Sequence, residues 1–438
     1  MSNIIINNKI KSFNKKIKVN GDKSLSIRWV LLASMASGVS KAKNLLISED
    51  VLAAIGAIKK LGIKVKFNNK ICEITGKGFN GYRYSNNLNI DAKNSGTLAR
   101  LLPGLLINSQ KKIKISGDES LSKRDFKRIT DPLGKFGAKF KLKKNKSLPM
   151  IIQGTDNPKP IYYNEKRGSA QCKSSIIFAG LKTLGTTLIK AKKSRNHTEL
   201  LCKYLSLPVM VKKKRNYDLI KIKKAKHIKP FNYDIPADIS SSAFFIILTV
   251  LSNNSKLLIK KVNVNSSRIG IITILKKMGV KIFFKNKKIY KGEPTADIFI
   301  KTPTKIKSIN CPTSLNSGAI DEFLAIFLVA AKANGVSYFK DLGELNQKES
   351  PRLKWGQKIL KLMGIKTKLS NNSIKIFGNP NLKIKKKIII KDYLKDHRVF
   401  MTSVIAALSF GGHWCIHDKE SINTSFPSFF NILKELKK

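Results

Sequence analysis

Six short polar clusters carry the residues of this sequence that are best suited to chemistry. Each cluster is built from Ser, Thr, Gly, Asp or Lys and runs directly into an apolar stretch of helical length. The N-terminus of a helix offers unpaired backbone N–H groups and the positive end of the helix dipole, so it favours anions. The clusters centre on Ser24, Thr97, Gln171, Ser240, Asp321 and His397. They predict binding of anionic groups, although Ser, Thr and Asp at a helix start also serve as ordinary N-caps.

Arginine is concentrated near these clusters, whereas lysine is spread over the whole chain. Of the 85 basic residues only 11 are Arg. A guanidinium binds a carboxylate or phosphate through two parallel hydrogen bonds, which an ammonium does not reproduce. Eight arginines lie in or beside the clusters or in the polar segments between them: Arg28, Arg100, Arg124, Arg128, Arg195, Arg268, Arg352 and Arg398. This distribution predicts recognition of small molecules that carry carboxylate and phosphate groups.

The formal net charge of +58 carries less information than its size suggests. Lys, Ile and Asn are abundant together, as expected from a coding bias toward AT-rich codons. Nucleic-acid-binding surfaces normally use Arg for bidentate contacts, and the sequence shows no Arg-rich stripe and no aromatics interleaved with basic residues. We therefore interpret most lysines as a solvated coat and expect no specific nucleic-acid partner. A basic RNA-binding or chaperone-like protein is the alternative from a different class.

Metal and cofactor sites are not indicated by the motifs. Gly21-Asp22-Lys23 precedes a helix but lacks the Walker spacing, and no G-x-G-x-x-G follows a strand. The five histidines show no metal-ligand spacing, and the five cysteines are scattered without a CxxC pair. No apolar run is long enough to span a membrane. We expect a soluble cytoplasmic protein that needs no cofactor and no metal.

The elements that position the clusters recur with them. Successive clusters are 69 to 81 residues apart, close to one sixth of the 438-residue chain, which predicts six structural units. The helix after each cluster is apolar almost all round and is expected to be buried. Between clusters, an amphipathic helix ends at a small residue and an alternating strand follows. Gly62, Gly137, Gly279 and Gly364 fit left-handed C-caps there, with Leu207 at the turn of a fifth, weaker copy.

These units predict the fold class. Each unit is expected to contain two helices and three or four strands, in a βαβαββ-type arrangement. Six of them are best accommodated as an α/β fold of two similar domains, each with three units. Within each domain, buried helices are surrounded by sheets and outer helices.

The motifs, taken in order, resemble the 5-enolpyruvylshikimate-3-phosphate (EPSP) synthase family, or 3-phosphoshikimate 1-carboxyvinyltransferases. Ten of them follow the family order between residues 21 and 430: GDKSLSIR, NSGTLAR, GDESLSKR, GSAQCKS, SRNHTE, DISSSAFF, AIDEF, QKESPR, DHRVFM and TSFPSFF. The resemblance implies the enolpyruvyl transferase fold. One domain would comprise residues 1–21 and 238–438 and the other residues 22–237, with the active site in the cleft between them.

The resemblance also implies the reaction. The carboxyvinyl group of phosphoenolpyruvate is transferred to the 5-hydroxyl of shikimate 3-phosphate, and phosphate is released. This is a step of the shikimate pathway, which leads to chorismate and the aromatic amino acids. A monomer without cofactor is expected. Both substrates are polyanions, so a site with many rigidly held cations agrees with the arginine distribution.

The matched motifs imply roles for individual residues. Shikimate 3-phosphate is expected to contact Lys23, Ser24, Arg28, Ser169, Ala170, Gln171, Ser194, Asp321 and Lys348. Phosphoenolpyruvate is expected to contact Lys23, Gly96, Arg124, Gln171, Arg352 and Arg398. Asp321 is the candidate base for the hydroxyl, and Glu349 lies with Lys348 where proton transfer at the enol carbon is expected. Which of Asp321, Glu349 and Lys23 moves which proton is left open by the sequence.

Some of these residues also have a purely structural explanation. Gly96 can serve close packing, and Ser24 and Ser169 can be helix caps. His397, at the start of an apolar helix, is best explained by a structural polar network. Lys173 either adds positive charge near the substrate phosphate or is solvated.

Several positions depart from the family pattern. Gly is usual where Lys93 stands, and some members carry a Lys where Thr424 stands, so that contact is not assigned. Pro351 replaces an Asp, and because proline fixes φ and removes a donor, it could shift Arg352; whether Pro351 and Ile27 weaken activity is left open by the sequence. None of the principal charged residues is lost, so we still expect activity. The remaining departures are Ile27, Asp125, Phe126, Ala237 and Leu324.

The nearest rival within the same fold is the family that acts on UDP-N-acetylglucosamine. That family carries a Cys in a mobile loop of its second unit. The corresponding stretch here, Gly117 to Arg128, contains no Cys. The sequence therefore favours shikimate 3-phosphate as the acceptor.

Overall fold

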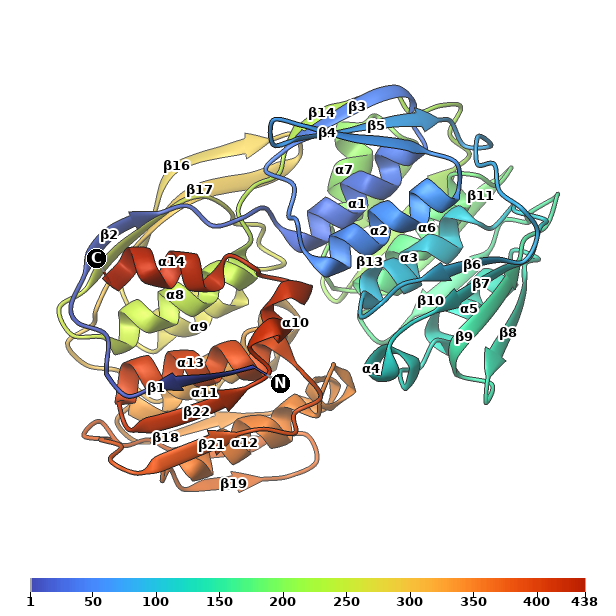
Figure 1. The fold of residues 1–438 in the computed structure, drawn as a ribbon. Helices are drawn as coiled ribbons and strands as arrows, with labels where there is room; N and C mark the ends of the chain where they lie inside the picture. Colours follow the sequence, from blue (N-terminus) through green and yellow to red (C-terminus); the bar gives the residue numbers. More distant parts are fainter. Residues whose placement is uncertain (1, 438) are drawn as a thin grey trace. The chain divides into compact units, whose positions relative to one another are not determined.

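A computed structural model describes residues 2–437 of the chain, which divides into two compact units. The amino unit comprises Gly21–Ile235 together with Ile289–Glu293. The carboxy unit comprises the residues up to Asn20, Pro236–Lys288 and the residues from Pro294 onward. Each unit contains three buried helices, three sheets and a set of outer helices (Figure 1), as the sequence predicts.

The amino unit is built around three buried helices. These are α1 (Lys23–Ser34), α3 (Gly96–Leu105) and α6 (Ala170–Gly180). Each begins directly after a side chain that caps it: Asp22, Ser95 and Ser169 accept a hydrogen bond from the first helical turn. The outer helices of the unit are α2 (Glu49–Lys60), the short α4 (Glu119–Ser122), α5 (Lys127–Gly134) and α7 (His197–Tyr204).

Its three sheets share one topology. Their orders are β14-β3-β5-β4, β6-β7-β9-β8 and β10-β11-β13-β12, and in each the first pair is parallel and the others are antiparallel. This identity of topology confirms the structural repeat. The strands are β3 (Ser37–Lys43), β4 (Lys64–Asn68), β5 (Ile71–Lys77), β6 (Leu88–Asp91), β7 (Ile113–Ser116), β8 (Lys139–Lys143), β9 (Ser147–Gln153), β10 (Tyr162–Glu165), β11 (Thr186–Lys192), β12 (Val209–Lys213), β13 (Tyr217–Lys223) and β14 (Asn232–Asp234).

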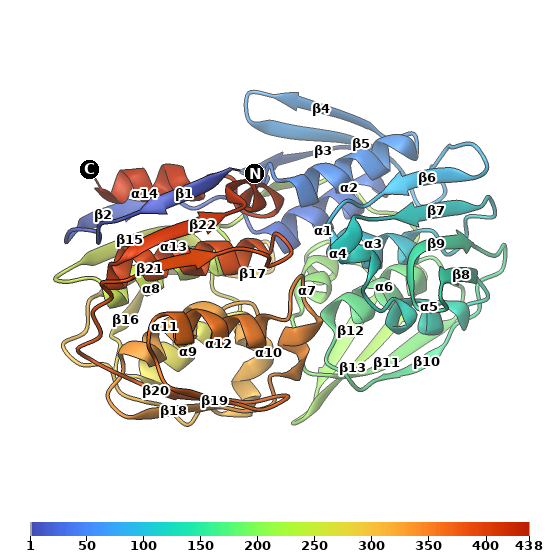
Figure 2. The same ribbon diagram turned by 60° about the horizontal axis from the view of Figure 1, so that its bottom comes forward.

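The carboxy unit repeats this plan. Its buried helices are α8 (Ile239–Leu251), α11 (Phe323–Lys332) and α13 (His397–Phe410). They pack on one another, and Figure 2 shows them from a second direction. Nearly all their residues are buried. The other helices are α9 (Gly270–Lys277), α10 (Asn316–Ala319), α12 (Arg352–Leu362) and α14 (Phe429–Lys437), with 3-10 turns η1 (Thr313–Leu315), η2 (Gly343–Gln347) and η3 (Lys419–Thr424).

The sheets of the carboxy unit include the beginning of the chain. Strand β2 pairs in parallel with β15, and β1 pairs antiparallel with β22. The sheet orders are β16-β17-β15-β2, β18-β20-β19 and β1-β22-β21. The strands are β1 (Asn3–Ile6), β2 (Asn14–Ile17), β15 (Lys256–Asn263), β16 (Ile282–Tyr290), β17 (Glu293–Lys301), β18 (Val336–Phe339), β19 (Thr367–Leu369), β20 (Ile374–Phe377), β21 (Lys387–Ile390) and β22 (His413–His417).

Four of the helix-to-strand turns use the predicted glycines. Gly62, Gly137, Gly279 and Gly364 have φ values between +83° and +105°, the left-handed region that glycine adopts without steric cost. In the fifth copy the prediction of Leu207 at the turn is wrong by one position, because Ser206 takes the positive φ of 54°. Leu207 instead contributes its side chain to the core of the amino unit.

Two further observations concern the chain as a whole. The tip of the β16–β17 hairpin, Ile289–Glu293, groups with the amino unit rather than with the strands that carry it. Within the described residues, no helix is both long enough and apolar enough to cross a membrane.

Candidate active site

In the amino unit, the starts of α3 and α6 are joined by side chains. Arg100 donates from Nη1 to Gln171 Oε1 at 2.8 Å, and Gln171 donates from Nε2 to Thr97 Oγ1 at 3.0 Å. Thr97 and Gln171 are the second residues of their helices. The starts of these two buried helices therefore lie together within this unit, and Gln171 contacts both of the other side chains.

Arg28 connects α1 to the same group. Its side chain is buried, with 3% of the residue exposed. Nη1 donates to Ser24 O at 3.1 Å, Nε donates to Thr198 Oγ1 at 2.8 Å, and Nη2 donates to Ser174 Oγ at 3.1 Å. The guanidinium is thus held by groups from α1, α6 and α7.

The serines differ in their local roles. Ser169 is the N-cap of α6, accepting from Cys172 N at 3.2 Å. Ser24 is not a cap, because Asp22 caps α1. Ala170 is the first residue of α6, and Ser194 lies in the loop before α7. The cap explanation therefore holds for one of the two serines.

Lys23 is held by a carboxylate that the sequence analysis did not single out. Its Nζ lies 2.8 Å from Asp50 Oδ2, and the two side chains are 19% and 7% exposed. Asp50 is in the first turn of α2, where the helix dipole favours an acidic residue. Asp50 therefore fixes the position of an ammonium that the family resemblance assigns to both substrates.

We expect Asp50→Asn to lower kcat/KM by about tenfold to hundredfold, because a hydrogen bond between charged groups contributes ~1.5–3 kcal/mol and Lys23 would lose its anchor. Steady-state kinetics with both substrates measure this. The matched control is Glu49→Gln, which removes the neighbouring, exposed carboxylate. Equal kcat/KM values for Asp50→Asn and Glu49→Gln would contradict a positioning role for Asp50.

Gly96 lies directly against two guanidinium groups. A Cβ atom added to it would come within 3.0 Å of Arg124 Nη1 and 3.3 Å of Arg100 Nη1. Arg124 follows the short helix α4 and donates from its backbone N to Leu121 O. The absence of a side chain at Gly96 thus keeps space for the ends of two arginines.

We expect Gly96→Ala to fold normally, because only the flexible ends of the two arginines must move. The displaced Arg124 should raise the KM for phosphoenolpyruvate by about tenfold, the scale of one weakened charge-assisted contact. The control is Gly56→Ala, because a Cβ there meets nothing within 4 Å. An unchanged KM in Gly96→Ala would show that the glycine serves packing alone.

In the carboxy unit, Arg352 is the hub of a buried network. Its Nε and Nη2 donate to the two oxygens of Asp396 at 2.8 and 3.1 Å, the bidentate geometry that arginine favours. Nη2 also donates to Glu349, and Nη1 lies 3.4 Å from Asp321 Oδ1. Ser350 donates to Asp396 at 2.8 Å. One guanidinium therefore binds three carboxylates.

The charges of the central pair stabilise each other. Burial opposes ionisation of Asp396, but the Arg352 guanidinium outweighs burial and holds the pKa of that carboxyl below its usual value. Burial likewise disfavours the charge on Arg352, but Asp396 and Glu349 outweigh it and raise the pKa of the guanidinium. Both groups are therefore charged at neutral pH.

Asp321 accepts hydrogen bonds from two cations. Lys348 Nζ lies 3.2 Å from its Oδ1, beside the contact with Arg352, and the Asp321 side chain is 14% exposed. Arg398 Nη1 donates to the backbone O of Asp321 at 2.8 Å. The structure therefore brings the predicted residues Asp321, Lys348, Arg352 and Arg398 together. Glu349 joins them through its ion pair with Arg352.

The starts of the three buried helices converge here as well. Arg268 donates to Ser240 Oγ at 2.7 Å, Ser240 donates to Glu322, and Arg398 Nη1 lies 3.9 Å from Glu322 Oε1. These contacts connect α8, α11 and α13. The starts of the buried helices are thus connected by side chains within each unit separately.

A comparison with known proteins decides the family. The profile of the family described as EPSP synthase (3-phosphoshikimate 1-carboxyvinyltransferase) matches residues 7–433. The chain is 38% identical to the 3-phosphoshikimate 1-carboxyvinyltransferase of Thermodesulfovibrio yellowstonii, covering 98% of this chain and 99% of that protein.

The chain belongs to the EPSP synthase family.

Solved structures agree with this membership. The EPSP synthase of Acinetobacter baumannii superposes with a TM-score of 0.86 at 32% identity, covering 99% of this chain and 98% of that one. The enolpyruvyl transferase NikO of Streptomyces tendae has a TM-score of 0.75 at 14% identity, a likeness of fold alone. The α/β fold predicted from the sequence is confirmed.

Two of the departures from the EPSP synthase pattern have local explanations. Lys93 has a φ of 53°, a conformation that suits the glycine usual in the family. Pro351 is the N-cap of α12, where a missing N–H costs little, and Arg352 directly after it makes the contacts described above. Thr424 Oγ1 lies 3.2 Å from His397 Nδ1, which supports the structural explanation of His397.

Lys173 is not solvated. It is completely buried, and its Nζ lies 2.6 Å from Glu199 Oε1. The predicted solvated role is therefore wrong.

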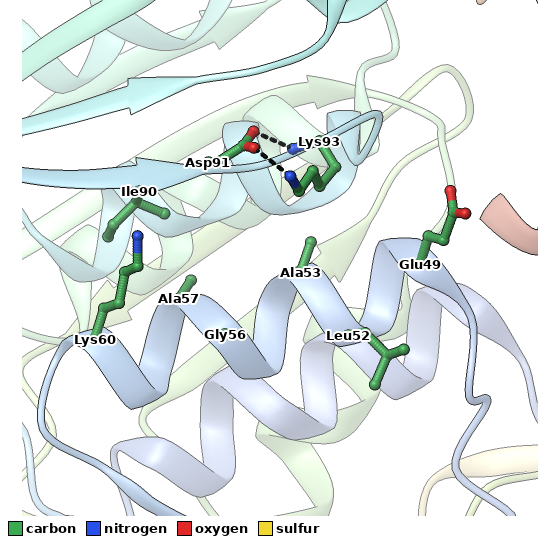
Figure 3. A pocket seen from close by; sticks show the side chains of 9 residues that line it. All are labelled: Glu49, Leu52, Ala53, Gly56, Ala57, Lys60, Ile90, Asp91 and Lys93. Atoms are coloured by element: carbon green, nitrogen blue, oxygen red, sulfur yellow. Dashed lines mark hydrogen bonds and ion pairs between the residues drawn. The ribbon is translucent and has the colours of Figure 1, made fainter.

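A cavity lies elsewhere in the amino unit. It has a volume of about 720 Å³ and lies between one face of α2 and the end of β6 (Figure 3). Its lining includes Ala53, Gly56 and Lys60 from α2, with Asp91 and Lys93 paired to each other opposite them. None of the residues assigned to substrates lines it. Within residues 2–437, no group of three or more His, Cys, Asp or Glu is placed to hold a metal ion.

Proposed function

We propose that these two networks carry out the reaction of the EPSP synthase family in this protein. In that reaction the 5-hydroxyl oxygen of shikimate 3-phosphate bonds to C2 of phosphoenolpyruvate while C3 gains a proton. The tetrahedral intermediate then loses phosphate and a C3 proton, which leaves an enol ether. The observation that supports the proposal best is the cluster of Asp321, Lys348, Glu349 and Arg352, which holds proton-transfer groups and cations together.

Shikimate 3-phosphate is assigned to the residues of the amino unit. Arg28 binds the substrate carboxylate, and Ser169, Ala170 and Ser194 bind the phosphate near the start of α6, where backbone N–H groups and the helix dipole favour an anion. Gln171 and Ser24 complete this group. This assignment is supported by the hydrogen bonds from Arg100 and to Thr97, which already hold the side chain of Gln171 in place, so it need not move when the substrate binds.

Phosphoenolpyruvate is assigned to cations of both units. Arg124 lies over Gly96 in the amino unit, and Arg352 and Arg398 belong to the carboxy unit. Lys23 serves both substrates.

Proton transfer is assigned to the carboxylates of the carboxy unit. Asp321 takes the hydroxyl proton of shikimate 3-phosphate, and the ammonium of Lys348 beside it stabilises the developing negative charge on oxygen. Glu349, whose side chain is 16% exposed, exchanges a proton with C3 of phosphoenolpyruvate. Lys23, the third candidate, contributes positive charge.

The test of this function is product identification by ³¹P NMR. Incubation with phosphoenolpyruvate and shikimate 3-phosphate should yield inorganic phosphate and a new shikimate product that keeps its own phosphate. UDP-N-acetylglucosamine as the acceptor should yield neither. Turnover of that acceptor with no reaction of shikimate 3-phosphate would contradict the assignment.

The expected setting of the reaction is a cytoplasmic monomer. Every residue assigned to a substrate comes from a single chain, so a second copy is not needed to complete the site. Light scattering during gel filtration should give a mass near 49.0 kDa.

A further inference from the structure

Two buried hydroxyl groups determine the orientation of Arg28. Nε donates to Thr198 Oγ1 at 2.8 Å and Nη2 donates to Ser174 Oγ at 3.1 Å. The two hydroxyls lie 2.7 Å apart, and Ser174 Oγ donates to Ala170 O at 2.7 Å. Thr198 is 0% exposed and Ser174 is 1% exposed.

The direction of each hydrogen bond follows from the number of protons. A serine hydroxyl has one proton, and that of Ser174 goes to the carbonyl of Ala170. Thr198 must therefore donate to Ser174, and both hydroxyl oxygens are left to accept from Arg28. The network has one consistent arrangement, which runs from the guanidinium to the first residue of α6.

An ion pair reinforces this network on the adjacent residues. Lys173 precedes Ser174 on α6, Glu199 follows Thr198 on α7, and Lys173 Nζ lies 2.6 Å from Glu199 Oε1. Two consecutive residues of α6 are thus paired with two consecutive residues of α7. We call Lys173, Ser174, Thr198 and Glu199 the α6–α7 clamp.

We propose that the α6–α7 clamp is a positioning device that presents Arg28 to the carboxylate of shikimate 3-phosphate. A guanidinium offers bidentate hydrogen bonds from either of two edges. The hydroxyls of the clamp accept from Nε and Nη2, and Ser24 O accepts from Nη1 at 3.1 Å, so the orientation of the guanidinium is fixed before the substrate binds. The proposal rests on the assignment of Arg28 to this substrate.

The clamp acts through preorganisation. An arginine side chain has several rotatable bonds, and ordering them during binding weakens affinity. The clamp orders Arg28 before the substrate arrives. The acceptors that the clamp supplies are hydroxyls, which carry no charge, whereas a carboxylate in their place would form an ion pair with the guanidinium.

The test is calorimetric titration of shikimate 3-phosphate into the full-length protein and its variants. We expect Ser174→Ala and Thr198→Val each to raise the Kd by about tenfold to hundredfold, because each leaves a buried N–H of Arg28 without its acceptor. Thr198→Ser keeps the hydroxyl and should restore binding to within about threefold of the original protein. The KM for phosphoenolpyruvate should change by less than about twofold, since its assigned contacts are elsewhere.

Ser175→Ala is the matched control, because Ser175 is on the same helix, is 1% exposed and makes no contact with Arg28 in the described network. The same Kd in Ser174→Ala and Ser175→Ala would overturn the proposal. A parallel rise in both KM values with a lowered Tm would also overturn it, because this pattern indicates general loosening. If the original protein does not bind shikimate 3-phosphate, the assignment of Arg28 fails first, and the proposal fails with it.

Discussion

Asp321→Asn should lower kcat by about 10²–10⁴-fold, the range by which a positioned general base accelerates a reaction. Asn has the same shape as Asp and can still accept a hydrogen bond from Lys348, which lies 3.2 Å from Oδ1. It cannot take the hydroxyl proton at neutral pH. Single-turnover measurement of phosphate release, with both substrates saturating, reports the chemical step directly.

The control for this variant is Asp341→Asn. Asp341 is exposed and has a φ of 55°, which Asn also tolerates. The Asp341→Asn variant should keep the original kcat. The Kd of Asp321→Asn for shikimate 3-phosphate should stay within about fivefold of the original value, because the isosteric amide keeps most contacts. A kcat near the original would exclude Asp321 as the base and leave Glu349 and Lys23 as candidates.

Arg352→Met should destabilise the protein by about 3–5 kcal/mol, the cost of leaving a buried charge uncompensated. Asp396 is 0% exposed and receives two hydrogen bonds from this guanidinium. The free energy of unfolding in urea measures the loss. Arg352→Lys keeps a positive charge without the bidentate geometry. Its free energy of unfolding should lie between those of the original protein and Arg352→Met.

The destabilisation by Arg352→Met should depend on pH. The folded-state pKa of Asp396 is lowered, so its ionised form adds stability above the unfolded-state pKa of about 3.9. That stability is lost as the pH falls through the folded-state pKa. The difference in the free energy of unfolding between the original protein and Arg352→Met should therefore be largest near neutral pH. It should shrink as the pH falls toward the lowered folded-state pKa of Asp396, because this buried carboxyl becomes protonated first in the variant. A difference that does not vary with pH would contradict the account of this pair.

The parts of the fold that follow from local pattern could be predicted. The six buried helices start within a few residues of the predicted clusters because apolar helices and their caps are encoded in adjacent residues. The four glycine turns were predictable for the same reason, since only glycine adopts a positive φ without cost. The error at Leu207 arose because Ser206 carries no comparable signal.

The parts that depend on tertiary contacts could not be predicted. Asp50 and Asp396 were missed as site residues because each looks like an ordinary residue at a helix start. Their importance comes from Lys23 and Arg352, which are 27 and 44 residues away in sequence. The burial of Lys173 likewise depends on Glu199 from another helix. For Asp396 a signal was present, since it directly precedes the His397-Arg398 pair of the recognised motif.

The net charge of +58 also gains a more precise meaning from the structure. Arg28 and Arg352 are almost completely buried and are bound by specific polar partners. Most lysines are exposed and make no such network. The cations proposed to bind the substrates are therefore a small subset held by specific partners, and the remaining charge can at most speed capture of anionic substrates at low salt.

The central claim is that this chain joins phosphoenolpyruvate to shikimate 3-phosphate, and the initial rate of phosphate release tests it most directly. The rate should saturate with each substrate and should fall to background when either is omitted. No release with both substrates saturating, from protein whose unfolding transition is cooperative, would contradict the account. Release that does not depend on shikimate 3-phosphate would contradict it equally.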